Sequence, residues 1–268
     1  ATDDNILPFI FNENTDPNQI PEDVSYIQIA EGVTEIPGEA FQWCEQLTRV
    51  DIPNTVTRIG SYAFLSCVSL ELINLPSSLT RIGDNAFDRS GLVEIDIPDS
   101  VTRIGDYVFE DCHSLQRIRF PANPELEMGS HVCLDCSNLT TVEIPSGIKS
   151  IPGRSFVDCH ALVSINIPDS VVSIGEEAFR DCISLTEVEL PKNVTRIGES
   201  AFMSCQNLAT VRLPQNTQLN IGNDAFRECP SLFQVQIPRL MTQQQQIAII
   251  DEINGSNHPS FQYVGLNN

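Results

Sequence analysis

The 268-residue sequence is poor in basic residues and has no long hydrophobic run. Fifteen lysines and arginines stand against 36 aspartates and glutamates, so the formal net charge is −21 and the pI is near 4.3. Nucleic-acid binding normally needs a basic stripe, and docking on anionic lipid needs basic clusters. A membrane-spanning helix needs about 18 consecutive apolar residues, and no run approaches that length. We therefore expect neither nucleic-acid partners nor direct membrane insertion.

A sequence repeat dominates what is present. The phrase L-x-x-[VI]-x-[IL]-P-x-x-V-x-x-I-G-x-x-A-F-x-x-C recurs from about residue 24 to residue 240. The cysteines mark its period: 23 residues separate Cys44 from Cys67 and Cys182 from Cys205, and neighbouring steps are 22 or 24. A fixed period of 20–29 residues is typical of a leucine-rich-repeat solenoid, in which each coil contacts only its neighbours.

Each coil combines two periodicities. Residues 50–52 alternate between apolar and polar, as in a half-buried strand, and Pro53 ends that strand because it cannot donate to a ladder. A second extended piece follows at 56–59. The apolar residues of 59–67 then fall on one face of a short helical turn, and Gly60 allows the chain to bend into it.

These patterns predict a leucine-rich-repeat superhelix of roughly nine coils of 22–24 residues. Its strands form a parallel ladder with short helical turns, and both ends are capped. We assign residues 1–23 to an N-terminal cap, 24–240 to the repeat array and 241–268 to a C-terminal capping helix and tail. Residues 1–23 could instead be a targeting or interaction segment, and the glutamines at 243–246 a flexible spacer. Residues 254–268 read as a loop or fraying end.

The segment from Ile97 to Cys112, IPDSVTRIGDYVFEDC, closely resembles the BspA-like leucine-rich repeats, also called Treponema pallidum-type repeats. The resemblance covers about four fifths of the chain. It implies a leucine-rich-repeat superhelix, a role in adhesion or protein binding, no catalytic apparatus, and a location on or outside the cell. The family has no shared ligand motif, so it assigns no binding residue here.

Nine cysteines are a high count, and eight of them occupy one slot of the repeat: Cys44, Cys67, Cys112, Cys136, Cys159, Cys182, Cys205 and Cys229. Ser90 takes that slot in the shortened third coil. We predict a buried ladder of free thiols that act as small apolar side chains. The spacing would also permit disulfides between coils, but equivalent side chains point parallel rather than at one another.

The ninth cysteine gives the motif His131-Val-Cys133-Leu-Asp-Cys136, half of a possible zinc site. A closed structural zinc site needs four ligands, and Cys133 aligns with the core residue Phe64, so we interpret the motif as a degenerate repeat. A Cys133–Cys136 disulfide is the other alternative. His113 and His160 follow repeat cysteines, but a core cysteine offers no accessible thiolate for catalysis. We expect no enzyme, cofactor or metal.

Charged residues at outward strand positions face each other across coils. Glu94 and Asp96 should lie beside Arg117 and Arg119, and Glu143 should continue the alternation of sign. Opposite pairs of this kind stabilise sheets, which explains the carboxylates better than calcium binding or catalysis does. The same surface is our candidate for partner binding, through Arg49, Asp51, Glu94, Asp96, Arg117, Arg119, Glu143, Glu187, Glu189 and Arg212.

Arg58, Arg81 and Arg103 share one slot on successive coils. Like charges about 5 Å apart repel, so the acids three residues further on should neutralise them, as Asp84 and Asp106 could. An anionic partner, such as a sulfated glycan or an acidic protein, is the alternative.

The favoured function is a non-enzymatic protein-binding or adhesion module that uses the outward strand face, with host, matrix or complex subunits as partners. The alternative is a structural or scaffolding subunit of a larger, possibly organellar, assembly. We expect an extracellular or cell-surface location, with an organelle lumen or the cytoplasm as alternatives. Three glycosylation triplets, at Asn138, Asn193 and Asn254, are too common by chance to decide between them.

Overall fold

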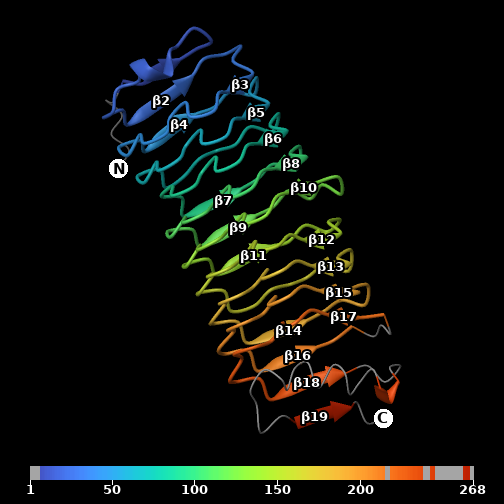
Figure 1. The fold of residues 1–268 in the computed structure, drawn as a ribbon. Coiled ribbons are helices and arrows are strands. Elements are labelled where there is room, and N and C mark those ends of the chain that lie inside the picture. Colours follow the sequence, from blue (N-terminus) through green and yellow to red (C-terminus); the bar gives the residue numbers. More distant parts are fainter. Residues whose placement is uncertain (1–6, 215–217, 238–241, 245–261, 266–268) are drawn as a thin grey trace.

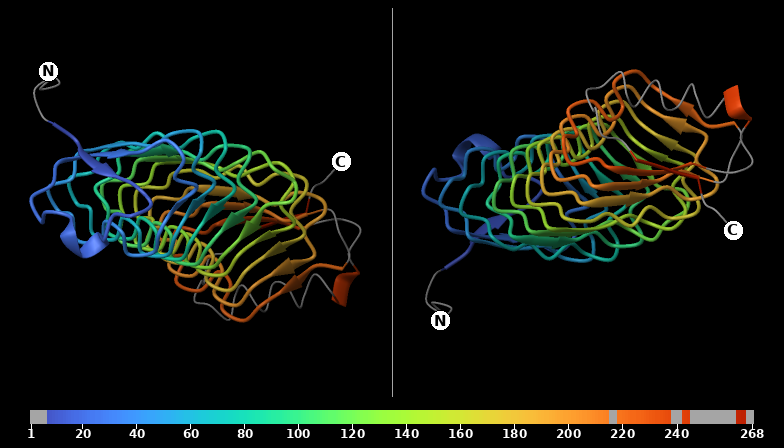
Figure 2. Two further views of the ribbon diagram at one scale, coloured as in Figure 1. Left: turned by 90° about the horizontal axis from the view of Figure 1, so that it is seen from above. Right: turned by 90° about the horizontal axis from the view of Figure 1, so that it is seen from below.

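The computed structural model describes residues 7–214, 218–237, 242–244 and 262–265. In them the chain winds into a parallel β-solenoid of about nine turns, which confirms the predicted fold (Figure 1). Successive coils stack along the rod with a progressive rotation, and β1 (Phe9–Phe11) and β19 (Gln262–Gly265) lie at opposite ends of it (Figure 1 and Figure 2). Among the described residues, no helix is long and apolar enough to cross a membrane.

The first column of strands carries the outward side chains predicted to bind partners, and we call its outer surface the strand face. Its backbone hydrogen bonds divide it into three parallel sheets, β1-β2-β4, β7-β9-β11 and β14-β16-β18-β19. The strands are β1 (Phe9–Phe11), β2 (Tyr26–Ile29), β4 (Arg49–Asp51), β7 (Glu94–Asp96), β9 (Arg117–Arg119), β11 (Thr141–Glu143), β14 (Glu187–Glu189), β16 (Thr210–Arg212), β18 (Gln234–Ile237) and β19 (Gln262–Gly265). Residues 71–75 form no strand, and Ser164 makes only an isolated bridge to Glu187.

The second column consists of two-residue strands on the next side of the coil. It is broken between β10 and β12, which gives a five-stranded and a four-stranded parallel sheet. The strands are β3 (Glu35–Ile36), β5 (Arg58–Ile59), β6 (Arg81–Ile82), β8 (Arg103–Ile104), β10 (Glu127–Met128), β12 (Ser150–Ile151), β13 (Ser173–Ile174), β15 (Arg196–Ile197) and β17 (Asn220–Ile221).

The third side of each coil differs from the short helical turn that its apolar spacing predicts. In residues 61–66, alternate N–H groups donate to alternate carbonyl oxygens of 84–88 in the next coil, at 2.8–2.9 Å. Two residues per coil have positive φ, for example Tyr62 (61°) and Ser66 (57°). The same pattern joins every coil from 39–43 to 224–228, with three hydrogen bonds of 2.7–3.2 Å at each junction. We call this third set of bonds the turn ladder.

The glycine of each I-G pair is needed for space, not for a bend. Gly60 is not among the described residues with positive φ. A Cβ atom built on Gly60 would lie 2.3 Å from the backbone nitrogen of Gly38 in the preceding coil, and one on Gly198 would lie 2.5 Å from that of Glu176. Real Cβ atoms do not approach backbone this closely, so the residue must be glycine for the coils to stack.

The core is a column of stacked phenylalanine rings. Phe64 and Phe87 lie 5.3 Å apart between ring centroids with an interplanar angle of 1°, and Phe179 and Phe202 lie 5.2 Å apart at 8°. Such rings bury large apolar areas and contribute strongly to folding. The column is interrupted where Cys133 takes the phenylalanine slot. There Phe120, the residue that follows the strand segment 117–119, packs edge-on against Phe156 at 6.5 Å.

Both ends of the strand column are covered by additional strands. At the N-terminal end β1 pairs in parallel with β2, and the 3-10 helix η1 (Pro17–Gln19) follows. At the C-terminal end β19 pairs in parallel with β18, so the tail predicted as a loop contains a strand. The predicted capping helix, and the spacer alternative for the glutamines, fall outside the described residues except for 242–244, of which 243–244 are helical.

Candidate functional site

The strand face alternates buried and outward side chains as the sequence predicts. In β9, Ile118 is fully buried while Arg117 and Arg119 point outward. The register places Arg117 opposite Glu94 on one side and Thr141 on the other. Arg119 lies between Asp96 and Glu143 in the same way. The predicted alternation of charge across these three coils is therefore present.

One ion pair follows that register and two depart from it. The guanidinium of Arg117 donates to Asp96 Oδ1 at 2.6 Å and to Glu94 Oε2 at 3.1 Å. This bond with Arg117 lowers the pKa of the Asp96 carboxyl, and the two acids raise the pKa of Arg117. Arg119 instead donates to Asp99 Oδ1 at 2.9 Å and to the carbonyl of Ile97 at 3.3 Å. About a third of each arginine side chain is exposed, at 34% and 35%, so both guanidiniums are held but reachable.

Near the N-terminal end a second group of charges forms within one strand. Arg49 pairs with Asp51 at 2.8 Å, and the hydroxyl of Tyr26 donates to the same carboxylate at 2.6 Å. The guanidinium of Arg49 also lies 4.4 Å from the centre of the Tyr26 ring, a cation–π distance. Arg49 lowers the pKa of Asp51, and the bond to Asp51 raises the pKa of Tyr26.

Toward the C-terminal end the face is more acidic. Arg212 donates to Glu189 at 3.1 Å, as the sequence predicts, while Glu187 lies opposite Thr210. Between the groups, Leu72 is 52% exposed in the segment 71–75, which contributes no strand to the strand face. The ten predicted residues thus form three separate clusters along the rod, and not one pocket.

The arginines of β5, β6 and β8, which we call the arginine column, are stacked in register, as predicted. The acids that neutralise their charges are not the predicted ones. Arg58 donates to Glu35 at 2.7 Å in the preceding coil, and Arg103 lies 3.7 Å from Glu127 in the following one. The acids expected to neutralise the column are engaged elsewhere. Asp84 accepts from the backbone N–H of Asp106 at 3.0 Å, and Asp106 from that of Ser130 at 2.7 Å. A cleft of about 200 Å³ borders Arg103 and these two aspartates.

The cysteine ladder is present as predicted. All nine cysteines are buried and free, and burial raises their pKa, to about 11 for Cys44. The thiols also form hydrogen bonds that the sequence did not predict. Cys182 donates its S–H to the carbonyl oxygen of Phe156 in the preceding coil, at 3.2 Å. Six more thiols make the equivalent bond, those of Cys67, Cys112, Cys136, Cys159, Cys205 and Cys229.

The H-x-C-x-x-C motif does not converge on a metal position. Cys133 and Cys136 are fully buried in the core, whereas the ring of His131 stacks on Tyr107 with centroids 4.2 Å apart. Burial lowers the pKa of His131, so its ring favours the neutral form. The degenerate-repeat interpretation fits these positions.

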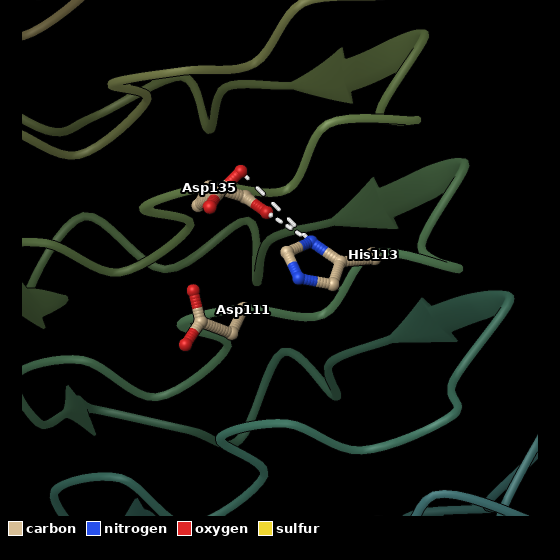
Figure 3. Close-up of side chains that lie close together, drawn as sticks. All are labelled: Asp111, His113 and Asp135. Carbon is tan, nitrogen blue, oxygen red and sulfur yellow. Dashed lines mark hydrogen bonds and ion pairs between the residues drawn. The ribbon is translucent and has the colours of Figure 1, made fainter.

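Sequence reasoning missed one group with metal-ligand chemistry, formed by Asp111, His113 and Asp135 (Figure 3). One ligand atom from each lies within 4.8 Å of the others. Existing contacts already engage two of the three side chains. Arg89 pairs with Asp111 at 3.0 Å, and Nδ1 of His113 lies 3.0 Å from the backbone oxygen of Asp135. A signal was visible in the sequence, since aspartate recurs two residues before the histidine slot in this coil and in the three that follow it.

Comparison with known proteins identifies the repeat. The family model for the BspA type leucine rich repeat region matches residues 34–163 and 126–253, with six copies. A leucine-rich repeat protein from Bacteroides ovatus is similar at 28% identity with a TM-score of 0.79, over 96% of this chain and 66% of that one. The chain therefore spans slightly less than two thirds of that protein.

Two further solved structures are more distant. A leucine rich cell surface protein from Faecalibacterium prausnitzii has 24% identity and a TM-score of 0.48, over 85% of this chain and 63% of that one. The T. pallidum leucine rich repeat protein has 23% identity and a TM-score of 0.35, over 85% and 81%. No curated protein matches the chain. The matched residues take in most of the array, and the chain belongs to the BspA-type leucine-rich-repeat family, whose fold is commonly used for protein binding or adhesion.

Proposed function

We propose that the chain is a non-enzymatic binding module that holds partner proteins on its strand face. The carrying observation is that Arg117 and Arg119 are fixed by acids of the preceding coil while about a third of each side chain remains exposed. Side chains already fixed lose little conformational entropy when a partner binds. Solenoids of this type present broad surfaces, over which contacts are spread instead of gathered in a deep pocket.

The central coils are the proposed centre of the interface. There the two arginines lie between Glu94 and Asp96 on one side and Glu143 on the other. A partner with a complementary pattern of charge would be oriented by this alternation, which affects specificity and association rate more than affinity. The clusters at Arg49–Asp51 and at Glu187, Glu189 and Arg212 extend the surface toward both ends.

The test is an affinity capture with the intact chain and a variant carrying Arg117→Glu and Arg119→Glu. The matched control is Arg154→Glu with Arg180→Glu, because these arginines also pair with acids but lie on the turn side of the coil. We expect partners to be lost from the first variant only, with thermal melting showing both folded. Partners unchanged in the strand-face variant would contradict the proposal. Recovery of the chain as a stoichiometric subunit after gentle purification would favour the scaffolding alternative.

The arginine column is the proposed site for an anionic glycan. Arg81 lies between Arg58 and Arg103, and the described residues include no acid paired with it, unlike its two neighbours. A sulfated oligosaccharide would supply the missing negative charge. Weaker binding of a heparin hexasaccharide by Arg81→Gln, with no change for Arg154→Gln, would support this; equal binding by both would refute it.

The proposed location is the cell surface or the extracellular space, in keeping with the family resemblance. Buried free thiols fit this location because they are shielded from oxidants, and they equally fit an organelle lumen or the cytoplasm. Labelling of intact source cells with a membrane-impermeant amine reagent separates the alternatives: modification of this chain places it outside, and protection places it inside.

A further inference from the structure

A cleft of about 720 Å³ lies at the N-terminal end of the turn ladder. One wall is formed by η1 and its neighbours, including Asn18 and Glu22, and the other by the first turn segment, residues 38–46. Among the described residues, its lining contains the carboxylates of Glu22, Glu39 and Glu45 and no lysine, arginine or histidine. The lining therefore carries three negative charges without a compensating cation.

The sole tryptophan of the chain lines this cleft in an unusual position. Trp43 has φ of 64°, a left-handed conformation that bulky side chains rarely adopt, and is 55% exposed. Within the described residues, no aromatic ring or guanidinium packs against it. The equivalent slot holds a polar residue in every later coil: Ser66, Arg89, Asp111, Asp135, Asp158, Asp181, Ser204 and Glu228. Neither backbone preference nor burial favours tryptophan at this position.

The polarity of the turn ladder adds a second, independent feature. Each coil contributes three peptide units whose carbonyls point to the preceding coil and whose N–H groups point to the following one. Aligned units of this kind sum to a macrodipole, as in a helix, with its negative end at the carbonyls. In a helix this end attracts cations. Here that end is the first coil.

The carbonyl oxygens at that end have no donor among the described residues. In the second coil, the carbonyls of 61, 63 and 65 accept from the N–H groups of 39, 41 and 43. The equivalent oxygens of the first coil are those of Gly38, Ala40 and Gln42, and no described group donates to them. All three residues line the cleft. The cleft thus combines a row of open acceptors, three carboxylates and an exposed indole.

We infer that this cleft binds a basic, extended peptide segment of a partner protein. The row of carbonyls accepts N–H donors along the segment, as an open ladder edge does. A lysine or arginine side chain lies over Trp43, the best cation–π partner among aromatic residues, with the three glutamates around it. A single metal ion fits less well. Among the described residues the group of metal-ligand side chains that converges within 4.8 Å is Asp111, His113 and Asp135, and not these glutamates.

The experiment is a titration of the full chain with N-acetylated, C-amidated hexa-arginine, followed by fluorescence. Trp43 is the only tryptophan, so its emission reports this cleft alone. We expect a saturable change with the basic peptide and none with hexaglutamate or maltohexaose. A response to maltohexaose without one to hexa-arginine would overturn the inference in favour of a saccharide site.

The whole chain is acidic, so it attracts a basic peptide at many places. Matched variants must therefore separate binding in this cleft from nonspecific electrostatic attraction to the rest of the surface. Calorimetry should show at least tenfold weaker binding for the triple variant Glu22→Gln, Glu39→Gln, Glu45→Gln and for Trp43→Ala. The control triple Glu71→Gln, Glu125→Gln, Glu199→Gln removes equal charge from exposed positions elsewhere and should stay within twofold of the parent. Equal weakening in both triples would overturn the inference. Arg117→Glu with Arg119→Glu should leave this binding unchanged, so failure here and failure of the strand-face proposal are distinguishable.

Discussion

The thiol of Cys182 donates a hydrogen bond to the carbonyl oxygen of Phe156 across 3.2 Å, joining two successive coils inside the core. Phe156 is fully buried, and an unsatisfied buried carbonyl is costly. The cysteine slot of the repeat therefore serves both packing and the hydrogen bonding of the preceding coil.

Replacing Cys182 by alanine should destabilise the protein by about 1–2 kcal/mol, because it removes a buried sulfur and leaves the carbonyl of Phe156 without its donor. The matched control is Cys44→Ala. Cys44 occupies the same slot in the first coil, and no bond from its thiol is described. Denaturant unfolding should show the smaller loss for Cys44→Ala. Equal losses would mean that the hydrogen bond contributes nothing.

Gly198→Ala should destabilise the array by at least about 2 kcal/mol, since its Cβ would lie 2.5 Å from the backbone of the preceding coil and the coils would have to separate. Gly153→Ala is the control, one slot further along the repeat, because Pro152 takes the position of the I-G glycine in that coil. It stands beyond the break between β10 and β12, and its nearest contact would be 3.2 Å. Thermal melting of both variants measures the difference. A larger effect at Gly153 would contradict the crowding explanation.

Asp88→Asn should raise the melting temperature at pH 7. Asp88 is buried, its Oδ1 has no hydrogen-bond partner and only a distant ion pair with Arg89 at 4.0 Å, and burial raises its pKa. A raised carboxyl pKa means that the folded state binds the proton more readily than the unfolded state. Stability from this group therefore falls as pH rises from its unfolded value through its folded value.

The advantage of Asp88→Asn should accordingly vanish near pH 3, where the parent carboxyl is protonated in both states. Asp169→Asn, at an exposed position, should change little at either pH. Melting curves from pH 3 to 8 provide the measurement. A gain that is equal at both pH values would exclude the titration of Asp88 as its cause.

Iodoacetamide at pH 8 should modify the native protein slowly and at its ends first. The pKa is raised to about 11 at Cys44 and to about 12 at Cys229, and these two thiols are slightly more accessible than the interior ones. Since only the thiolate reacts, the interior cysteines should react only after unfolding, when all nine become available. Peptide mass spectrometry gives the order. Early reaction at Cys159 or a mass indicating a Cys133–Cys136 disulfide would contradict the free, buried ladder.

The stacking direction and the core follow directly from the sequence because they depend on periodicity. The cysteine spacing gives the coil length, and the apolar slots that contain Phe64 and Ile59 give the buried set. The sign alternation of Asp96, Arg119 and Glu143 follows from register alone. The partner that each arginine chooses could not be predicted, because long side chains can reach past the residue directly opposite. Arg117 pairs with both Glu94 and Asp96, and Arg119 pairs with Asp99 instead of Asp96.

The turn ladder could not be predicted from apolar spacing, because its positions 59, 63 and 67 also suit a helical turn. What decides the conformation is the next coil, whose carbonyls accept the alternate N–H groups. The compensation for Cys133 was equally hidden. Phe120 reaches the gap from another side of the coil, and a repeat alignment compares only equivalent slots. Trp43 was visible as a departure from its slot, but the cleft beside it depends on where η1 lies.

The interruptions of the two strand columns occur at different coils. The strand face is broken at 71–75 and near Ser164, and the second column between β10 and β12, while the turn ladder runs unbroken through every described junction. Every described junction between coils is therefore bridged by backbone hydrogen bonds, including those where a strand column is interrupted. Under tension, we expect the coils to detach one at a time from the two ends of the rod, where each coil has a single neighbour, before any junction in the middle separates.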